Sequence, residues 1–176
     1  MHKLLDEFSS LHYVQSYTTR AVRSWETNGE KYWHISKDVF EQGIAADAFL
    51  EYALVHNQDL YGTKLSAIMD VLERWKTPIK EIEIAGYKQV HAHETMNTLA
   101  KSIFLTISDD IVRQRILNRD PNTPAYDIEQ RIASAEKERQ YAQDNCDIVI
   151  DAGRPLEEVE HDVIQALYSL GLWDEQ

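Results

Sequence analysis

Two arginines in the N-terminal part of the chain have the spacing and the surroundings of an anion-binding site. Arg20 and Arg23 lie three residues apart, directly after Thr18 and Thr19, in the sequence TTRAVR. Guanidinium groups bind phosphate oxygens through paired hydrogen bonds, and neighbouring hydroxyl groups add further donors. These residues predict a pocket for a compact anion such as a phosphate group. The alternative is a solvated turn that carries two surface arginines.

The charge of the whole chain favours a small anion over a polyanion. The 176 residues contain 30 aspartates and glutamates against 18 lysines and arginines, a formal net charge of −12. This charge argues against nucleic acid or an anionic membrane as a partner. No stretch approaches the roughly 20 apolar residues that span a bilayer, and no signal peptide is evident. The sequence therefore predicts a soluble protein. Because the single Cys146 cannot form an internal disulfide, it also predicts a location in the reducing cytoplasm.

A lone carboxylate lies inside the apolar segment 47–56. Glu51 is the only charged residue in DAFLEYALVH apart from the ends of the segment. Burying a carboxylate costs several kcal/mol unless a partner pairs with it. The position therefore implies that some other group pairs with Glu51.

Strands that alternate with helices predict an α/β fold with a mainly parallel sheet. We expect strands at residues 12–17, 79–84, 102–107 and 146–151, the third buried on both faces. Helices are expected at residues 2–8, from Ser36 to Ile44, from a Thr63 cap to Trp75, from Gly86, from Ser108 to Arg119, from Pro124 or Asp127 to about Asn145, and from Pro155 to Gly171. A turn is expected at Asn28 and Gly29 between strand-compatible flanks.

Taken in order along the chain, these segments resemble the guanylate kinase family. The pattern T-T-R-x-x-R followed by G-x-x-Y reads as TTRAVR with Gly29 and Tyr32, F-[LI]-E-[YW]-A occupies residues 49–53, and Y-G-[TS] occupies residues 61–63. Next come E-I-D-x-x-G at residues 81–86, R-x-x-x-R at Arg115 and Arg119, I-x-x-R-[LI] at residues 128–132, and D-x-V-[IV] at residues 147–150. Each motif alone is weak, but their order and spacing together are specific.

The resemblance implies the architecture of the family. That architecture is a P-loop kinase-like parallel sheet core flanked by helices, with an inserted small GMP-binding subdomain and a short lid. The core would comprise residues 1–17, 77–117 and 133–176, the GMP-binding subdomain residues 18–76, and the lid residues 118–132.

The resemblance also implies roles for residues around GMP. The GMP phosphate would be held by Arg20, Arg23, Tyr32 and Tyr61. Guanine has two adjacent donors, N1–H and the exocyclic amine, which one carboxylate can accept together, whereas adenine has no such pair. Glu51 would be that carboxylate, with the hydroxyl groups of Ser16 and Thr63 near the base.

For the donor nucleotide, the resemblance implies Mg²⁺ with ATP. Phosphoryl transfer depends mainly on positioning and charge neutralisation, so Arg115, Arg119 and Arg131 are candidates for contacts with the donor phosphates and the transition state. The alternative for these arginines is pairing on a solvated helix, such as Arg131 with Asp127. Glu81 or Glu83 could orient Mg²⁺ or the substrate, and which of them does so stays open.

Several positions depart from the family pattern. Glu83 stands where aspartate is usual, His34 stands where phenylalanine is usual, and the loop between Glu51 and Tyr61 is about one residue longer. His91 and His93 lie two apart in an expected helix and so face different directions, which argues against a metal site there.

The largest departure is in the ATP-binding loop. The family binds ATP through G-x-x-x-x-G-K-[ST], which has no counterpart in the 176 residues. In the family this loop follows the first core strand, upstream of the position where this sequence begins. Loss of that strand would leave two strand edges unpaired. We therefore expect an N-terminally truncated guanylate kinase that lacks the first core strand and ATP affinity, with the loop encoded upstream of Met1.

The sequence leaves three functions open. The first is transfer of the ATP γ-phosphate to GMP, giving GDP, in purine nucleotide metabolism. The second is a non-catalytic guanylate kinase-like binding module, and the third is a related kinase for a ribosyl phosphate, which would not need Glu51. Retention of both the guanine-reading residues and the lid arginines favours the enzyme.

Overall fold

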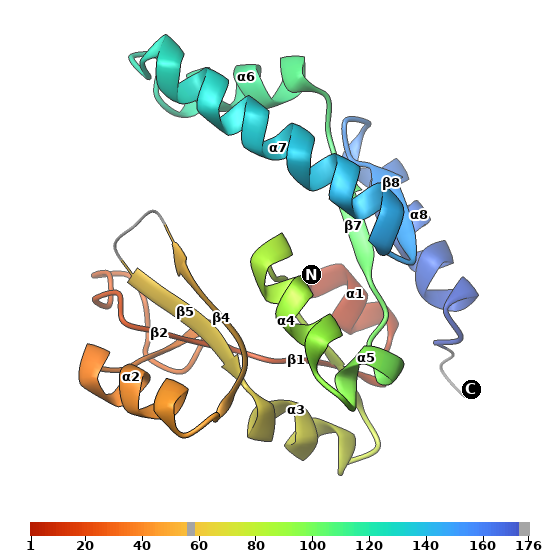
Figure 1. Cartoon of the computed structure of the whole chain (residues 1–176). Helices are drawn as coiled ribbons and strands as arrows, with labels where there is room; N and C mark the ends of the chain where they lie inside the picture. The colour runs from red at the N-terminus through yellow and green to blue at the C-terminus, as the bar shows by residue number, and fades with distance from the viewer. Residues whose placement is uncertain (56–58, 173–176) are drawn as a thin grey trace. The chain divides into compact units, whose positions relative to one another are not determined.

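The computed structural model describes residues 1–55 and 59–172, which divide into two compact units, residues 1–100 and residues 101–172 (Figure 1). Each unit is described by itself. The loop expected to be one residue longer than usual includes residues 56–58, which lie outside the described residues. In the part of the chain that is described, no helix has the length and apolar character needed to cross a membrane.

The N-terminal unit combines five helices with six strands. Its helices are α1 (His2–Glu7), α2 (Lys37–Ala45), α3 (Leu65–Leu72), α4 (Ile84–Ala92) and α5 (Met96–Leu99). Its strands are β1 (Leu11–Tyr13), β2 (Ser16–Thr18), β3 (Tyr32–His34), β4 (Phe49–Val55), β5 (Asp59–Lys64) and β6 (Thr77–Ile79). β1 and β6 form a parallel pair, and the other four strands form a sheet in the order β3-β2-β5-β4.

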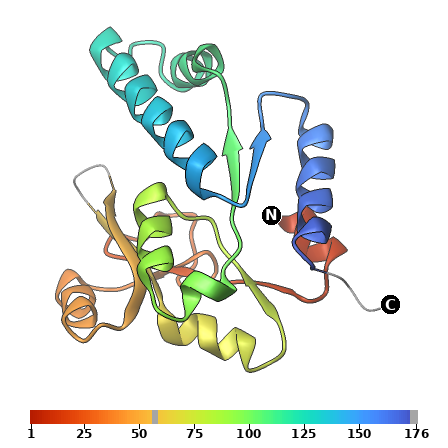
Figure 2. The same ribbon diagram turned by 45° about the vertical axis from the view of Figure 1, so that its right-hand side comes forward.

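The C-terminal unit is simpler. It contains β7 (Ile103–Thr106), α6 (Asp109–Arg119), α7 (Ala125–Asn145), β8 (Ile148–Asp151) and α8 (Leu156–Ser169). Figure 2 shows β7 and β8 side by side, and they pair in parallel. As expected, the Ser108 hydroxyl caps α6 by accepting a hydrogen bond from the Ile111 amide. The α/β fold class predicted from the sequence is confirmed.

The four-stranded sheet has a helix on each side. Figures 1 and 2 show α2 and α4 on opposite sides of it. On the α2 side, the fully buried Phe40 stacks on Phe49 of β4, with ring centroids 4.3 Å apart. On the α4 side, Leu50 packs in an apolar cluster with Val90 of α4 and Ile68 of α3. The sheet is therefore held by apolar contacts on both faces.

A β-bulge in β4 decides which side chains face α4. The register with β5 shifts between Phe49 and Glu51. Leu50 packs with Val90 of α4, and a Cβ added to Gly86 of α4 would lie 2.7 Å from Oε2 of Glu51. Strict alternation would send Leu50 and Glu51 to opposite faces, but the extra residue of a bulge lets both face the same helix.

The strand expected at residues 12–17 is in fact two strands of different sheets, so that prediction was wrong. β1 ends at Tyr13, although the Val14 amide still donates to the carbonyl of Ile79 at 3.1 Å. The chain then leaves β6 and pairs with β3 and β5 from Ser16 onward. The apolar alternation continued through the break because residues on both sides of it are buried.

The strand expected at residues 79–84 was also wrong. β6 ends at Ile79, and α4 begins at Ile84, two residues before Gly86. Its partner β1 ends at Tyr13, which pairs with Ile79, so no strand is available to continue the ladder. Glu81 and Glu83 consequently lie in the connection between β6 and α4.

Three smaller expectations need correction. Lys64, and not Thr63, is the N-cap of α3, because the Thr63 hydroxyl bonds to a side chain of the sheet. α3 ends at Leu72, so Trp75, with φ 58° and 95% exposure, lies beyond it. β7 is not buried on both faces, since Leu105 is 51% exposed and β8 is its one strand partner among the described residues.

Gly62 of β5 provides a test of how closely β4 and β5 approach each other. A Cβ at this position would lie 2.7 Å from the carbonyl oxygen of Glu51 and 2.9 Å from Cβ of Tyr52. We predict that Gly62→Ala lowers the free energy of unfolding in urea by about 1–3 kcal/mol, because the strands must shift apart. Ser66→Ala, at an exposed position of α3, is the control and should change it by less than about 0.5 kcal/mol. Equal stability of Gly62→Ala and the parent would contradict the close approach.

Candidate functional site

Most of the residues predicted to bind an anion and a base lie on the four-stranded sheet and its loops. They form two groups within the N-terminal unit. One group surrounds the guanidinium of Arg20, and the other surrounds the carboxylate of Glu51. Both groups include residues from β2 and β5.

Arg20 follows the end of β2 and is held by three hydrogen bonds from its guanidinium. Nε donates to the Tyr61 hydroxyl at 3.1 Å, Nη1 to the Ala21 carbonyl at 2.8 Å, and Nη2 to Glu26 at 2.8 Å. The Arg20 amide donates to the hydroxyl of the buried Thr18 at 3.1 Å. A guanidinium has five N–H donors, so the contacts found among the described residues leave two for a ligand.

Glu26 connects Arg20 to the backbone of Arg23. Its Oε1 pairs with the Arg20 guanidinium, and its Oε2 accepts the Arg23 amide at 3.0 Å. The hydrogen bond from Arg20 is the main reason that the pKa of Glu26 falls from 4.5 to about 2, and the Arg23 amide adds to it. The same pair raises the pKa of Arg20. Sequence reasoning missed Glu26, for which the one available signal was an acidic residue close to two arginines.

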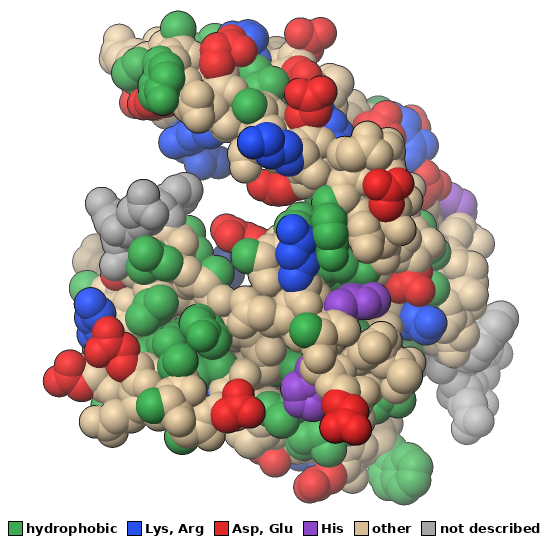
Figure 3. Space-filling model, in the orientation of Figure 1, with side chains coloured by type: hydrophobic (Ala, Val, Ile, Leu, Met, Phe, Trp, Pro, Cys, Tyr) green, Lys and Arg blue, Asp and Glu red, His purple; other side chains and the backbone are tan. Residues whose placement is uncertain are grey.

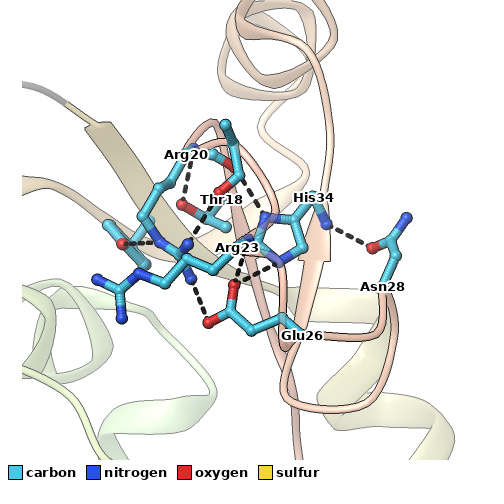
Figure 4. A network of polar contacts seen from close by, with 8 residues as sticks. Thr18, Arg20, Arg23, Glu26, Asn28 and His34 are labelled. Carbon is cyan, nitrogen blue, oxygen red and sulfur yellow. Dashed lines mark hydrogen bonds and ion pairs between the residues drawn. The ribbon is translucent and has the colours of Figure 1, made fainter.

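His34 lies on the other side of this pair. Its Nδ1 is 2.7 Å from the carbonyl oxygen of Arg20, and its Nε2 is 3.8 Å from Oε2 of Glu26. The His34 amide donates to Oδ1 of Asn28 at 2.8 Å. Figure 4 shows the side chains of Arg20, Glu26 and His34 pointing toward one another. The sequence marked His34 only as a departure from the family pattern.

Tyr32 and Tyr61 lie beside Arg20, whereas the Arg23 side chain does not. The two tyrosine rings meet edge to face with centroids 5.7 Å apart, and the Arg20 guanidinium is 5.7 Å from the Tyr32 centroid. The Arg23 guanidinium lies 5.8 Å from the Trp25 ring and points away from Glu26 (Figure 4). Thus three of the four predicted phosphate ligands come together, and Arg23 contributes its backbone to the cluster.

The loop that carries these residues returns to the sheet through a turn at Asn28 and Gly29. Gly29 has φ 88°, a conformation that favours glycine, and its amide donates to the Tyr32 carbonyl at 2.8 Å. This turn was predicted, but its upstream flank is not a strand, and β3 pairs with β2 in parallel. A cavity of about 610 Å³ lies against the loop, lined by residues that include Arg23, Glu26, Tyr32, His34 and Glu81.

The carboxylate of Glu51 is buried in the second group, with the residue 7% exposed. Its Oε1 accepts a hydrogen bond of 2.6 Å from the hydroxyl of Thr63, which is itself 1% exposed. Burial raises the pKa of Glu51, although the Thr63 hydrogen bond and the charge of Lys80 act in the opposite direction. Its Oε2 faces the space left by the missing side chain of Gly86.

The sheet register lines up the three residues predicted to contact the base. Glu51 on β4 pairs with Thr63 on β5. Tyr17 on β2 pairs with Gly62 in the antiparallel sense, which puts the buried Ser16 in the same row as Thr63. Ser16, Thr63 and Glu51 therefore follow one another across three adjacent strands.

The two other acidic candidates, Glu81 and Glu83, are exposed. Tyr13 has a raised pKa, chiefly because it is buried and also because of the charge and hydrogen bonding of Glu81. The charge of Glu83 contributes to the raised pKa of Glu51, so it lies near that carboxylate. Within residues 1–55 and 59–172, no group of three or more His, Cys, Asp or Glu side chains could hold a metal ion.

The predicted arginines of the C-terminal unit lie on α6 and α7, which run side by side (Figure 1). Arg115, Arg119 and Arg131 are all exposed, and the single contact found for their guanidinium groups in the described residues is a long one of 3.5 Å from Arg115 to the Ala152 carbonyl. The pair of Arg131 with Asp127, which was the alternative to a role with the donor phosphates, is not among the ion pairs of the described residues. Sequence reasoning missed Arg113, which pairs with Glu129 of α7, and Arg139, which pairs with Asp109 of α6.

Comparison with known proteins gives consistent matches over most of the chain. The family model described as guanylate kinase matches residues 1–170. A guanylate kinase of Helicobacter hepaticus is 33% identical over 139 residues, covering 78% of this chain and 68% of the relative. A guanylate kinase of Campylobacter jejuni is 35% identical over 140 residues, with 78% and 66% covered. The chain thus spans about two thirds of the length of these relatives.

A solved structure extends the match to the fold. The crystal structure of guanylate kinase from Anaplasma phagocytophilum matches 99% of this chain and 81% of that chain, with a TM-score of 0.73 and 22% sequence identity. This likeness agrees with the parallel pairs and flanking helices described above.

Charged side chains of both signs lie on the surface. On the face shown in Figure 3, acidic and basic side chains are interspersed, and no continuous basic patch is visible there. The cations near the Arg20 cluster are local exceptions in a chain of net charge −12.

The raised pKa of Glu51 predicts a pH dependence of stability. A carboxyl whose pKa is higher in the folded state than in the unfolded state loses stabilising free energy as pH rises from the unfolded value through the folded value. We predict that the free energy of unfolding of the parent falls, relative to that of Glu51→Gln, as pH rises above about 4.5. Urea unfolding of both proteins at pH values from 4.5 to 8 measures this difference. Glu41→Gln, on an exposed part of α2, is the matched control. Parallel stability curves for Glu51→Gln and the parent would contradict a carboxylate desolvated by the fold.

Proposed function

The chain belongs to the guanylate kinase family, and we propose that its N-terminal unit binds GMP as the phosphate acceptor. The observation that carries the proposal is the buried carboxylate of Glu51, held in one row with Thr63 and Ser16. A buried carboxylate can accept more hydrogen bonds than the one that the Thr63 hydroxyl donates to Glu51, and guanine offers two neighbouring donors in N1–H and the exocyclic amine. The hydroxyl groups of Thr63 and Ser16 would contact the same base.

The phosphate of GMP is proposed to bind at Arg20. This guanidinium is already fixed by Tyr61, Ala21 and Glu26, so little conformational freedom is lost when a ligand binds to its remaining N–H groups. The Tyr32 and Tyr61 hydroxyl groups would add donors. The Arg23 guanidinium is exposed and would reach the phosphate by leaving the ring of Trp25.

For the reaction, we propose transfer of the ATP γ-phosphate to GMP, giving GDP. Arg115, Arg119 and Arg131 are proposed for the donor phosphates and the transition state, since their charges are not used in the ion pairs that link α6 to α7. ATP would come with Mg²⁺, and Glu81 or Glu83 is proposed to orient the ion or the substrate. Because the 176 residues contain no G-x-x-x-x-G-K-[ST] sequence and the described residues contain no metal cluster, no step is assigned to either group.

We also propose a division of labour along the chain and a cellular location. Residues 18–76 would form the GMP-binding part, residues 118–132 the lid, and the remainder the core. The four-stranded sheet runs from Ser16 to Lys64, so it lies mostly within residues 18–76 but begins two residues before them. The single cysteine supports a location in the reducing cytoplasm.

Loss of the Arg20 side chain should weaken GMP binding strongly. We predict that Arg20→Ala raises the Kd for GMP by roughly thirtyfold or more, equivalent to about 2 kcal/mol of charge-assisted hydrogen bonding. Isothermal titration calorimetry with the 176-residue chain measures this change. Arg74→Ala removes an exposed arginine of the same unit and should leave the Kd unchanged. An Arg20→Ala protein with the parent's affinity would refute the phosphate assignment.

Replacing the base-reading carboxylate should reduce discrimination between purines. We predict that Glu51→Gln lowers the preference for GMP over AMP by at least tenfold, because a neutral amide cannot accept both guanine donors through two anionic oxygens. The ratio of the two dissociation constants is the measurement, and Glu41→Gln serves as the matched control. If Glu51→Gln keeps the parent's ratio, Glu51 does not read the base.

A further inference from the structure

The imidazole of His34 has a defined hydrogen-bonding arrangement. Nδ1 lies 2.7 Å from the carbonyl oxygen of Arg20, and a carbonyl oxygen can only accept, so Nδ1 must carry a proton. The His34 side chain is 6% exposed, and its backbone is fixed by the hydrogen bond to Asn28. The ring therefore has one orientation, in which Nε2 faces the carboxylate of Glu26.

Protonation of Nε2 changes the interaction with Glu26. In neutral His34 the proton is on Nδ1, so Nε2 presents a lone pair to Oε2 of Glu26 at 3.8 Å, and no hydrogen bond forms. In the imidazolium form, both nitrogens are donors, and the contact becomes an ion pair. The same carboxylate already pairs with the guanidinium of Arg20. His34 thus acts on the charge that lies closest to Arg20.

We propose that His34 is a positioning residue for the acceptor phosphate, and that it holds Arg20 through Glu26 and the Arg20 carbonyl most strongly when its ring is protonated. This inference rests on the proposed GMP site. A phosphate dianion at Arg20 is repelled by the Glu26 carboxylate. Imidazolium at His34 neutralises that carboxylate while leaving the Arg20 guanidinium in place, so the phosphate binds more tightly.

The other charged groups around His34 are of both signs. The cavity that His34 lines also holds Tyr13, Arg23, Glu30, Lys31, Tyr32 and Glu81. Together with Arg20 and Glu26, these supply the carboxylates Glu26, Glu30 and Glu81 and the cations Arg20, Arg23 and Lys31. One further positive charge on His34 makes this group of described residues more positive. Added positive charge favours an anionic ligand.

Phenylalanine is the natural test substitution. His34→Phe keeps an aromatic ring in the fold while removing both ring nitrogens. A Tm of His34→Phe equal to that of the parent would show that the packing of the ring is preserved.

The experiment measures the Kd of GMP for the 176-residue chain at pH 6 and pH 8, in the parent and in His34→Phe. The ratio of the variant's Kd to the parent's Kd should be roughly threefold to tenfold larger at pH 6 than at pH 8, as expected for one added charge within several ångströms. Ionisation of the GMP phosphate and of Glu51 occurs in both proteins and cancels in the ratio. A merely structural role would change the Kd equally at both pH values.

Two further variants separate the hydrogen bond from the charge. His34→Gln keeps a side-chain N–H donor but cannot become charged, so it should lose the gain at pH 6 while retaining most of the affinity at pH 8. Glu26→Gln removes the carboxylate through which His34 acts, so in a Glu26→Gln background the Kd ratio for His34→Phe should differ less between pH 6 and pH 8 than it does in the parent background. His12→Gln, at an exposed position of β1, should behave as the parent does.

The outcomes distinguish this inference from the proposed function. If the parent does not bind GMP at either pH, the proposed function fails and this inference fails with it. If the parent binds GMP and the ratio for His34→Phe is the same at pH 6 and pH 8, the inference alone is overturned.

Discussion

The carboxylate of Glu51 is buried between a sheet and a helix, and several local features of the N-terminal unit are needed to keep it there. Burial of a charged group costs several kcal/mol unless hydrogen bonds compensate it. Thr63 supplies one such bond from the neighbouring strand, the β-bulge in β4 turns Glu51 toward α4, and Gly86 leaves room for its second oxygen. The raised pKa of Glu51 indicates that the compensation is incomplete. A ligand with two adjacent donors would complete it.

The pairing of β2 with β5 connects this carboxylate to the Arg20 cluster. Ser16 and Thr63, which are proposed to contact the base, lie in one row of the sheet. Two residues further along the same two strands, Thr18 pairs with Tyr61. The Thr18 hydroxyl accepts a hydrogen bond from the Arg20 amide, and the Tyr61 hydroxyl accepts one from Nε of Arg20. Two residues of strand span about 7 Å, which leaves space for a ribose between the base and the phosphate. One antiparallel register therefore sets the spacing between both ends of the proposed site.

The sequence predicted which side chains come together at this site better than it predicted the backbone that carries them. The α/β class and the caps at Ser36 and Ser108 followed from local patterns. The joining of Arg20 with Tyr32 and Tyr61 followed from the resemblance to the family. The strand at residues 79–84 was wrong because its alternation is local, whereas the length of β6 is set by where β1 ends. Thr63 was taken for a helix cap because a threonine before an apolar periodic run favours one, yet Glu51 captures its hydroxyl. Glu26 was missed because an acidic residue close to two arginines is a weak signal in a chain with 30 acidic residues.

A crystal structure of the 176-residue chain with GMP would test the account most directly. The account predicts that the guanine N1–H and exocyclic amine lie within hydrogen-bonding distance of the two oxygens of Glu51, and that the phosphate contacts Arg20 while Glu26 stays paired with it. A nucleotide bound with its base away from Glu51, or with its phosphate away from Arg20, would contradict the central claim that one strand register holds both ends of a guanine nucleotide.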